Sequence, residues 1–235
     1  MTERPGAERR SPPLSSPTYA VRAPLARWLE AQANELRGRI GPYRLLDVGC
    51  GEKPYLPFFE PYVSEYVGVD VVANPFAELL GPIEALPVED ASFDVVLCAQ
   101  VLEHCDDPAQ AVAELRRVTR PGGRVLASTH GVMVYHPSPA DYWRWTHAGL
   151  ERLFRQNGDW SAVTVSPASG TTACLGMTFS LFIDLLAKRV GARRAAGLLV
   201  AGINRAAAAV DGRVPALREL RPGSLIANYH VAADA

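Results

Sequence analysis

The sequence predicts an open, doubly wound α/β domain with a mostly parallel sheet. Three observations lead to this fold. Strand-like apolar runs alternate with amphipathic helical segments from residue 43 onward. The first of these runs leads directly into a Gly-x-Gly turn at Gly49 and Gly51. Asp70 ends the next strand, about twenty residues beyond the turn, where such folds place a carboxylate beside ribose hydroxyls.

Composition favours a globular protein with a core and disfavours a broad nucleic-acid-binding face, although a local basic patch remains possible. The chain has 235 residues, 48% of them hydrophobic and 21% charged, which is enough apolar material for a sizeable core. A formal net charge of −1 gives no support for a broad nucleic-acid-binding face. The cysteines, Cys50, Cys98, Cys105 and Cys174, show no Cys-x-x-Cys pair and no zinc spacing with histidine. We therefore expect reduced thiols in a cytoplasmic protein, and no metal site.

The N-terminal part divides into a leader and a helix. Residues 1–18 contain prolines and arginines but no apolar stretch of a signal peptide, so we expect a disordered leader. Apolar side chains at helical spacing predict an N-terminal helix over residues 19–37, ended by glycines and a proline.

A cofactor-binding core is expected over residues 43–129. Its strands are predicted at residues 44–48, 65–70, 77–80 (weak), 93–98 and 124–128. A helix over residues 108–120 begins with Pro108 and precedes Pro121-Gly122-Gly123. This order of elements favours parallel strands with right-handed crossovers.

The rest of the chain is expected to complete the sheet with two strands and, with the N-terminal helix, to cover the cofactor cleft with a helical insertion. The predicted parts are a substrate-side segment over 130–158, an alternating strand over 160–166, a helical insertion over 171–212 and a last strand over 224–232. The apolar run at 171–187 is interrupted by Asp184 and is short for a span of about 20 residues. We expect packing helices there, and contact with a membrane surface is considered but not favoured.

The glycine turn restricts the cofactor. A dinucleotide site uses a third glycine, but Glu52, Lys53 and Pro54 stand where a pyrophosphate needs free backbone amides. A cofactor with a ribose and no pyrophosphate fits better, and S-adenosylmethionine is one. Asp47 could favour its positive charge, or could simply cap the turn.

Five segments then match a known family in order and spacing. Leu45 to Gly51, Leu-Leu-Asp-Val-Gly-Cys-Gly, resembles the first motif of class I S-adenosylmethionine-dependent methyltransferases. Four further segments resemble the later motifs of this family, at residues 67–70, 86–96, 101–108 and 117–123. The chain is thus similar to the type 11 methyltransferases, and residues 53–55 and 141–146 resemble a bacterial subset of them. This resemblance implies a Rossmann-like, mostly parallel seven-stranded sheet, with the last strand inserted antiparallel after a helical insertion.

The resemblance also implies which residues bind the cofactor. They are Gly49, Cys50 and Gly51 near the methionine part, Asp70 at the ribose, Val71 on the adenine, Glu84, Ala85 and Leu86 at the adenine edge, and Gln100 and Val101 facing the sulfonium and substrate. Lys53 stands at the position where many relatives have a third glycine. Pro82 stands at the position where relatives usually have an aspartate that reaches the adenine amine. Glu84 or backbone groups could take over the role of that aspartate.

Catalytic and substrate residues are expected after the fourth and fifth strands. A general base is needed only if the methyl acceptor arrives protonated. His130 is our first choice and His104 our second, with His136, Asp141 and His147 as further candidates. The expected substrate-side residues are Tyr55, His136, Asp141, Tyr142, Trp143, Arg144 and His147. Three structural alternatives remain open. Trp143 could be a core residue, and Arg144 could form an ion pair with Asp141. Glu103 and His104 could simply hold their loop together.

The sequence therefore predicts methyl transfer from S-adenosylmethionine to a small-molecule, sugar or lipid-linked acceptor. An S-adenosylmethionine-binding protein without catalysis is the first alternative. An NAD(P)-dependent oxidoreductase is disfavoured by the missing third glycine. A nucleic-acid methyltransferase is disfavoured by the charge balance and by the lack of an Asn/Asp-Pro-Pro-Tyr-type segment after the fourth strand.

Overall fold

A seven-stranded sheet organises the chain in the computed structural model, which describes residues 5–137 and 140–235. The strand order is β3-β2-β1-β4-β5-β7-β6. The strands are β1 (Tyr43–Val48), β2 (Val63–Asp70), β3 (Leu79–Leu80), β4 (Phe93–Ala99), β5 (Thr119–His130), β6 (Ala162–Pro167) and β7 (Asn228–Asp234). The α-helices are α1 (Ala7–Arg10), α2 (Tyr19–Ile40), α3 (Leu56–Phe59), α4 (Pro108–Val118), α5 (His147–Gln156), α6 (Thr171–Val190) and α7 (Arg193–Arg213). Short 3-10 turns occur at Ile83–Ala85 and Pro215–Leu217.

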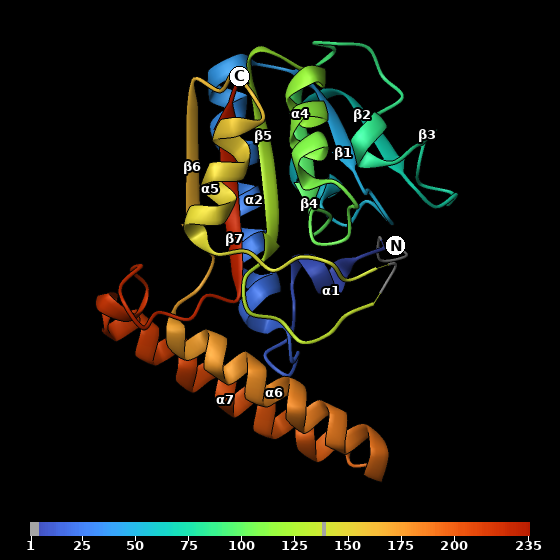
Figure 1. Cartoon of the computed structure of the whole chain (residues 1–235). Helices are drawn as coiled ribbons and strands as arrows, with labels where there is room; N and C mark the ends of the chain where they lie inside the picture. Colours follow the sequence, from blue (N-terminus) through green and yellow to red (C-terminus); the bar gives the residue numbers. More distant parts are fainter. Residues whose placement is uncertain (1–4, 138–139) are drawn as a thin grey trace.

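The pairing of the strands confirms the predicted topology. Strands β1 to β5 pair in parallel, whereas β7 lies between β5 and β6 and is antiparallel to both. Because parallel strands need crossovers, the helices between them cover the two faces of the sheet. Figure 1 shows α4 and α5 on one face and α2 on the other.

Alternation along the strands builds one core on each face. Leu46 and Val96 belong to the cluster under α4 and α5, while Leu45 and Val95 belong to the cluster under α2 and α3. Successive side chains of a strand point to opposite faces, so a continuous apolar run fills both cores. This is why the central strands read as unbroken apolar segments in the sequence.

Capping fixes where two of the helices begin, at the edge where the strands end. The Asp107 carboxylate accepts hydrogen bonds from the amides of Ala109 and Gln110, and Pro108 occupies the first turn of α4. Thr146 Oγ1 accepts from the amide of Gly149 at the start of α5. Both caps follow loops that leave the carboxyl end of the sheet, and so fix those loops in place.

Strand β5 is longer than expected at its N-terminal end. It begins at Thr119, before Pro121-Gly122-Gly123, whereas the sequence predicted a strand from residue 124. The register shifts between Phe93 and Val95 of the neighbouring β4, so the glycines form an irregularity within extended chain and not a break.

The N-terminal segment differs from the expected disordered leader. Residues 1–4 lie outside the described residues, but residues 5–18 contain α1 and pack against the domain. Arg10 Nη1 donates a hydrogen bond to the carbonyl oxygen of Pro54 at 2.6 Å, next to the glycine turn. Asn204 Nδ2 donates to the carbonyl oxygens of Leu14 and Ser16 at 2.7 and 2.9 Å. Residues 5–18 therefore belong to the folded domain, contrary to the expected disordered leader over residues 1–18. Hydrogen bonds to distant elements hold this segment, which has no apolar periodicity.

Helices α6 and α7 form an antiparallel pair at the end of the sheet where the parallel strands finish. Figure 1 shows this hairpin extending well beyond the sheet. Near its base, buried Cys174 and Met177 pack with Ala20 and Val21 of α2. The predicted helical insertion before the last strand is thus two long helices, of which the base contacts the domain.

Candidate active site

The glycine turn after β1 needs its glycines for two separate reasons. Gly49 and Gly51 have φ values of 67° and 50°, in the left-handed region that side chains with a Cβ rarely adopt. A Cβ on Gly49 would also lie 2.4 Å from Val101 Cγ2. The turn can therefore approach the end of β4 only if residue 49 is glycine.

Asp70 holds the glycine turn and its own loop together. Its Oδ2 accepts a hydrogen bond from the amide of Gly51 at 2.9 Å, and its Oδ1 accepts from the amide of Val72 at 3.1 Å. A carboxylate has about four acceptor sites, so each oxygen retains capacity for a hydroxyl donor. The carboxylate is thus fixed in position at the end of β2 and can still accept further hydrogen bonds.

Lys53 explains how the turn works without a third glycine. It adopts a φ of 48°, the backbone conformation that glycine adopts most readily. Its Nζ lies 2.6 Å from both carboxylate oxygens of Glu78, and Glu78 Oε2 also accepts from the amide of Gly68 at 2.6 Å. The ion pair anchors the Lys53 side chain and offsets the cost of its left-handed backbone.

Asp47 is buried behind the glycine turn and does not line the cavity at the ends of the strands. Its buried carboxylate accepts a hydrogen bond from the hydroxyl of Tyr66 at 2.7 Å. Burial is the main cause that raises the pKa of Asp47, to about 7, against the opposing effect of that hydrogen bond. Any influence of Asp47 on a bound cation therefore acts through the turn and not by contact with the cavity.

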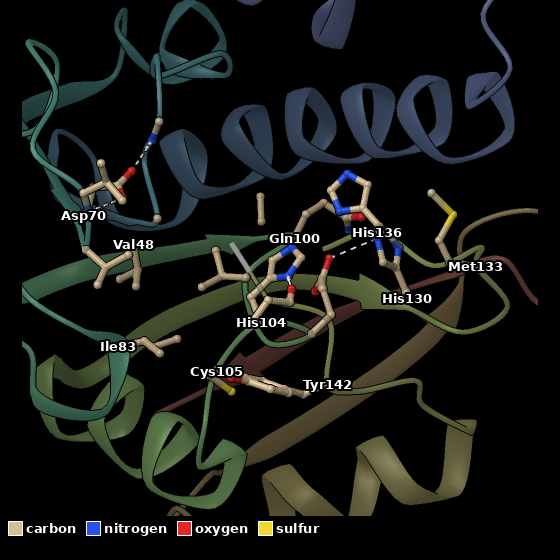
Figure 2. A pocket seen from close by; sticks show the side chains of 18 of the residues that line it. Val48, Asp70, Ile83, Gln100, His104, Cys105, His130, Met133, His136 and Tyr142 are labelled. Atoms are coloured by element: carbon tan, nitrogen blue, oxygen red, sulfur yellow. Dashed lines mark hydrogen bonds and ion pairs between the residues drawn. The ribbon is translucent and has the colours of Figure 1, made fainter. Parts of the chain in front are cut away.

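One cavity of about 710 Å³ opens at the carboxyl ends of β1, β2, β4 and β5. Open α/β sheets bind ligands at this edge. Figure 2 shows Asp70 and Val48 at one end of the cavity, and His104, His130 and His136 gathered at the other. Gln100 lies beside the histidines and has a φ of 61°, an uncommon backbone conformation for a residue that is not glycine.

His104 has one ring nitrogen occupied and the other available. Its Nδ1 is hydrogen-bonded to the carbonyl oxygen of Ala140. Because a carbonyl oxygen can only accept, Nδ1 carries the proton and Nε2 of the neutral ring has a free lone pair. Burial lowers the pKa of His104 below 6.5, so the neutral ring predominates at pH 7.

His130 lies in a buried polar group with Glu103 and Asn228. Asn228 Nδ2 lies 3.4 Å from His130 Nδ1, which places the ring proton on Nε2, and that atom is 3.2 Å from Glu103 Oε1. Glu103 Oε2 accepts from the hydroxyl of Thr129 at 2.8 Å, whereas Oε1 has no hydrogen bond within the described residues. Burial raises the pKa of Glu103 to about 7 and lowers that of His130 to about 3.

Arg144 clasps the loop after β5. Its Nη1 and Nη2 lie 2.5 and 2.9 Å from the two carboxylate oxygens of Asp141, a bidentate pair, and Nη2 also donates to the carbonyl oxygen of Val134. Asp141 further accepts from the amide of His136. The alternative in which Arg144 pairs with Asp141 is therefore the arrangement present, and the substrate-side segment is held by its own ion pair. Residues 138–139 of that segment lie outside the described residues.

The cavity brings together many of the predicted residues but not all. Those that line it are Gly49, Gly51, Tyr55, Asp70, Val71, Glu84, Gln100, Val101, His104, His130, His136 and Tyr142. Those outside its lining are Asp47, Cys50, Ala85, Leu86, Asp141, Trp143, Arg144 and His147. Trp143 Nε1 donates to the carbonyl oxygen of Cys105, and His147 Nε2 contacts that of Val165 at 3.0 Å. The Glu84 carboxylate accepts from the amide of Asp106 at 2.8 Å, so it is partly engaged in its own loop.

Sequence reasoning missed several residues of the cavity. Arg9 and Arg22 approach from the N-terminal segment and α2, Glu103 from the loop after β4, and Met133 and Leu181 from the far side. Glu103 offered a signal, since a carboxylate next to His104 follows directly on a buried strand. Arg9 and Leu181 offered none, because only the packing of distant segments brings them to the cavity. Among the described residues, no group of three or more His, Cys, Asp or Glu could hold a metal ion.

The fold and the site define a class of protein. A parallel sheet with an antiparallel β7 between β5 and β6, and a cavity between a glycine turn and an acidic strand end, form the class I Rossmann-like methyltransferase fold. Residues 46–127 match the model of a family described as a methyltransferase domain, type 11. This part of the chain is a class I S-adenosylmethionine-dependent methyltransferase domain of the type 11 group, and S-adenosylmethionine is the cofactor of the class.

Individual relatives agree with this family. The uncharacterized methyltransferase YcgJ of Bacillus subtilis is 36% identical over 103 residues, which are 37% of this chain and 41% of that protein. The ubiquinone biosynthesis O-methyltransferase of Bordetella avium is 30% identical over 128 residues, 48% of this chain and 52% of that protein. The matches thus span about half the length of these relatives or less. The crystal structure of 1,6-didemethyltoxoflavin-N1-methyltransferase from Burkholderia thailandensis superposes with a TM-score of 0.54 at 16% identity, covering 92% of this chain and 80% of that one, and supports the fold alone.

Proposed function

We propose that this chain transfers a methyl group from S-adenosylmethionine to a small-molecule, sugar or lipid-linked acceptor. The observation that carries the proposal is one continuous cavity that runs from Gly49 and Asp70 to His104 and His130. Its first end has the groups that suit the cofactor, and its second end has the groups that suit an acceptor. When bound, S-adenosylmethionine supplies a methyl carbon on a sulfonium, which is already a good leaving group.

The residues at the first end fit this cofactor. The fixed carboxylate of Asp70 can accept from ribose hydroxyls, and Gly49 and Gly51 expose backbone where no Cβ intervenes. Val71 is 62% exposed on the cavity wall and offers apolar surface for a base. Arg9 and Arg22 also line the cavity and offer guanidinium groups for the cofactor's carboxylate.

We assign the role of proton acceptor to His104 ahead of His130. His104 Nε2 has a free lone pair beside the cavity, since Nδ1 carries the proton for Ala140. In the neutral His130 ring, Nδ1 instead lies 3.4 Å from Asn228 Nδ2, and Nε2 lies 3.2 Å from Glu103 Oε1 in a geometry that makes no hydrogen bond. His130 and Glu103 therefore act as positioning residues, which keep the far wall of the cavity polar and fixed.

Orientation of the two reactants and exclusion of water from the cavity would supply the rest of the rate enhancement. Met133, Leu181 and Ile83 give the cavity apolar walls around its few polar groups. A nucleophile held there approaches a fixed methyl carbon with little solvent to displace. Such a site needs no metal and few ionised groups to promote methyl transfer.

The test combines a binding experiment with a turnover experiment. Isothermal titration calorimetry should detect S-adenosylmethionine binding with one site per chain. Incubation with panels of hydroxyl, amine and carboxyl acceptors should then yield S-adenosylhomocysteine, followed by mass spectrometry of the methylated product. Binding without turnover on any acceptor favours the non-catalytic alternative, and binding of a nicotinamide dinucleotide in its place overturns the proposal.

A further inference from the structure

An apolar stripe runs along the outer side of α6. It consists of Leu175, Phe179, Phe182, Leu186 and Val190, which are 54%, 58%, 53%, 45% and 75% exposed. At about 100° of rotation per residue, these positions fall within one narrow sector of the helix. Contiguous exposed aromatic and aliphatic side chains of this kind mark an interaction site on a protein surface.

Other positions of α6 provide the contacts with α7 that are seen in the hairpin. Gly176 faces α7 from a different side of α6, since a Cβ in its place would lie only 3.2 Å from Ile203 Cγ2. Asp211 of α7 accepts hydrogen bonds from the amides of Thr172 and Ala173 and so caps α6. The hairpin is thus stable through its inner side, and the large side chains of the stripe remain available.

Helix α7 also exposes large apolar side chains. Leu198 and Leu199, in the second turn of α7, are 79% and 54% exposed. Among the described residues, neither α6 nor α7, nor any other helix, has the length and apolarity needed to cross a membrane. The exposed surface therefore suits contact with an apolar phase at its boundary and not insertion through it.

Basic residues surround the turn between the two helices. Lys188, Arg189, Arg193 and Arg194 lie within seven residues of one another. Only Lys188 has an acidic partner in the described chain, Asp184, at 2.6 Å. Residues 171–213 contain six Lys or Arg and two Asp, a net charge of +4, so the rest of this chain of net charge −1 has −5. Positive charge is therefore concentrated on the hairpin that also exposes the apolar stripe.

We propose that the α6–α7 hairpin docks on the surface of an anionic lipid bilayer. The apolar stripe would enter the boundary between headgroups and acyl chains, while the four basic side chains at the turn meet lipid phosphates. Both features lie on one element that extends beyond the sheet (Figure 1). The docking does not depend on whether the chain transfers methyl groups.

Charge argues against a second copy of the chain as the occupant. A two-fold interface would bring the same surface of both copies together, and with it two hairpins of net charge +4. Like charges in such contact oppose association unless anions intervene. An anionic bilayer offers both an apolar phase for the stripe and negative charge for the basic side chains at the turn.

Docking would also place the cavity near the lipid. Leu181 of α6 lines the cavity, about a third of a turn away from the stripe on the same helix. The hairpin is therefore both a wall of the candidate active site and the element that meets the membrane.

Vesicle co-sedimentation tests the proposal. The full chain should pellet with vesicles of phosphatidylcholine and phosphatidylglycerol, and far less with phosphatidylcholine alone. The double variant R193Q/R194Q should lower the partition coefficient by roughly tenfold or more, at about 1 kcal/mol per arginine near the surface. F179S/F182S should lower it by a similar factor, because two aromatic side chains lose their apolar contact. Raising NaCl from about 0.1 M to about 1 M should weaken binding as the Debye length shortens.

Matched controls separate docking from general effects. L80S removes an equally exposed leucine from β3, and R27Q/R152Q removes two exposed arginines outside the hairpin. Both should bind anionic vesicles as the wild type does, and every variant should keep its affinity for S-adenosylmethionine and its melting temperature. Equal loss in the controls, or no vesicle binding by the wild type, overturns the proposal. So does a wild-type dimer in analytical ultracentrifugation that F179S/F182S converts to a monomer.

Discussion

Asp70 Oδ2 accepts a hydrogen bond from the backbone amide of Gly51 at 2.9 Å, which joins the end of β2 to the glycine turn after β1. The two residues that the sequence spacing selected as a cofactor site are therefore in direct contact. Since one carboxylate fixes the turn and also faces the cavity, its loss should act on cofactor binding in two ways.

Asp70→Ala should weaken S-adenosylmethionine binding by at least about fivefold, because an unmade hydrogen bond costs about 1 kcal/mol and the turn loses its anchor. Isothermal titration calorimetry measures the change. Asp159→Ala, which removes an exposed aspartate far from the cavity, serves as the control and should bind normally. An unchanged dissociation constant for Asp70→Ala would exclude this carboxylate from the cofactor site.

His104→Gln should lower kcat by roughly 10²-fold or more when the acceptor arrives protonated, since general bases contribute on that scale. His130→Gln should lower it less, because His130 positions the site and does not accept the proton. Steady-state rates of S-adenosylhomocysteine formation compare the two. The reverse order of effects would return the role of base to His130.

The pH profile of the wild type follows from the same geometry. Burial lowers the pKa of His104 below 6.5, so the neutral ring persists as pH falls past that value. We expect kcat/KM to stay level through pH 6.5 and to fall only at lower pH. A decline that begins above pH 6.5 would mean that another group, such as Glu103 with a pKa raised to about 7, limits the reaction.

Local patterns were sufficient to predict the sheet and to select residues that meet at one end of the cavity, whose role in binding the cofactor stays a prediction. The unbroken apolar run of β4 indicated a strand buried on both faces, and the position of Asp70 after the glycines indicated the ribose site. Both depend on periodicity and short-range spacing, which the sequence shows directly.

The acceptor end could not be predicted in the same way. Whether Arg144 binds a substrate or Asp141 depends on how the loop after β5 folds back on itself, and its bidentate pair decides the question. Residues 5–18 lack apolar periodicity, and Asn204 holds them from far along the chain. The helices α6 and α7 were predicted as packing elements, but only the folded chain reveals which of their sides remains exposed.

His230→Phe should reduce the loss of stability in acid. The buried His230 ring stacks on Trp28 with centroids 4.6 Å apart, and its Nε2 has no hydrogen-bond partner among the described residues. Burial lowers its pKa from 6.5 to about 3. The unfolded chain therefore binds a proton below pH 6.5 that the folded chain does not bind until about pH 3, so stability is lost across that range as pH falls.

The size of this effect follows from the two pKa values. Between pH 7.5 and pH 5, the wild type should lose about 2 kcal/mol more than His230→Phe, which keeps the ring stack and cannot titrate. Urea denaturation at the two pH values measures the difference. Asp47 and Glu103, whose pKa values are raised, shift stability in the opposite direction but do so in both proteins. Parallel losses in the two proteins would show that His230 is accessible to protons when folded.

Asn204→Ala should release the N-terminal segment from the domain. The buried amide of Asn204 donates to the carbonyl oxygens of Leu14 and Ser16, and its removal leaves both acceptors without this donor, at a cost of about 1 to 3 kcal/mol. Because Arg9 of that segment lines the cavity, S-adenosylmethionine affinity should fall as well. Limited trypsin digestion should show faster cleavage after Arg9 and Arg10, whereas Asn34→Ala, which changes an exposed asparagine, should digest like the wild type. If cleavage accelerates while affinity stays constant, the segment covers the domain without contributing to the cofactor site.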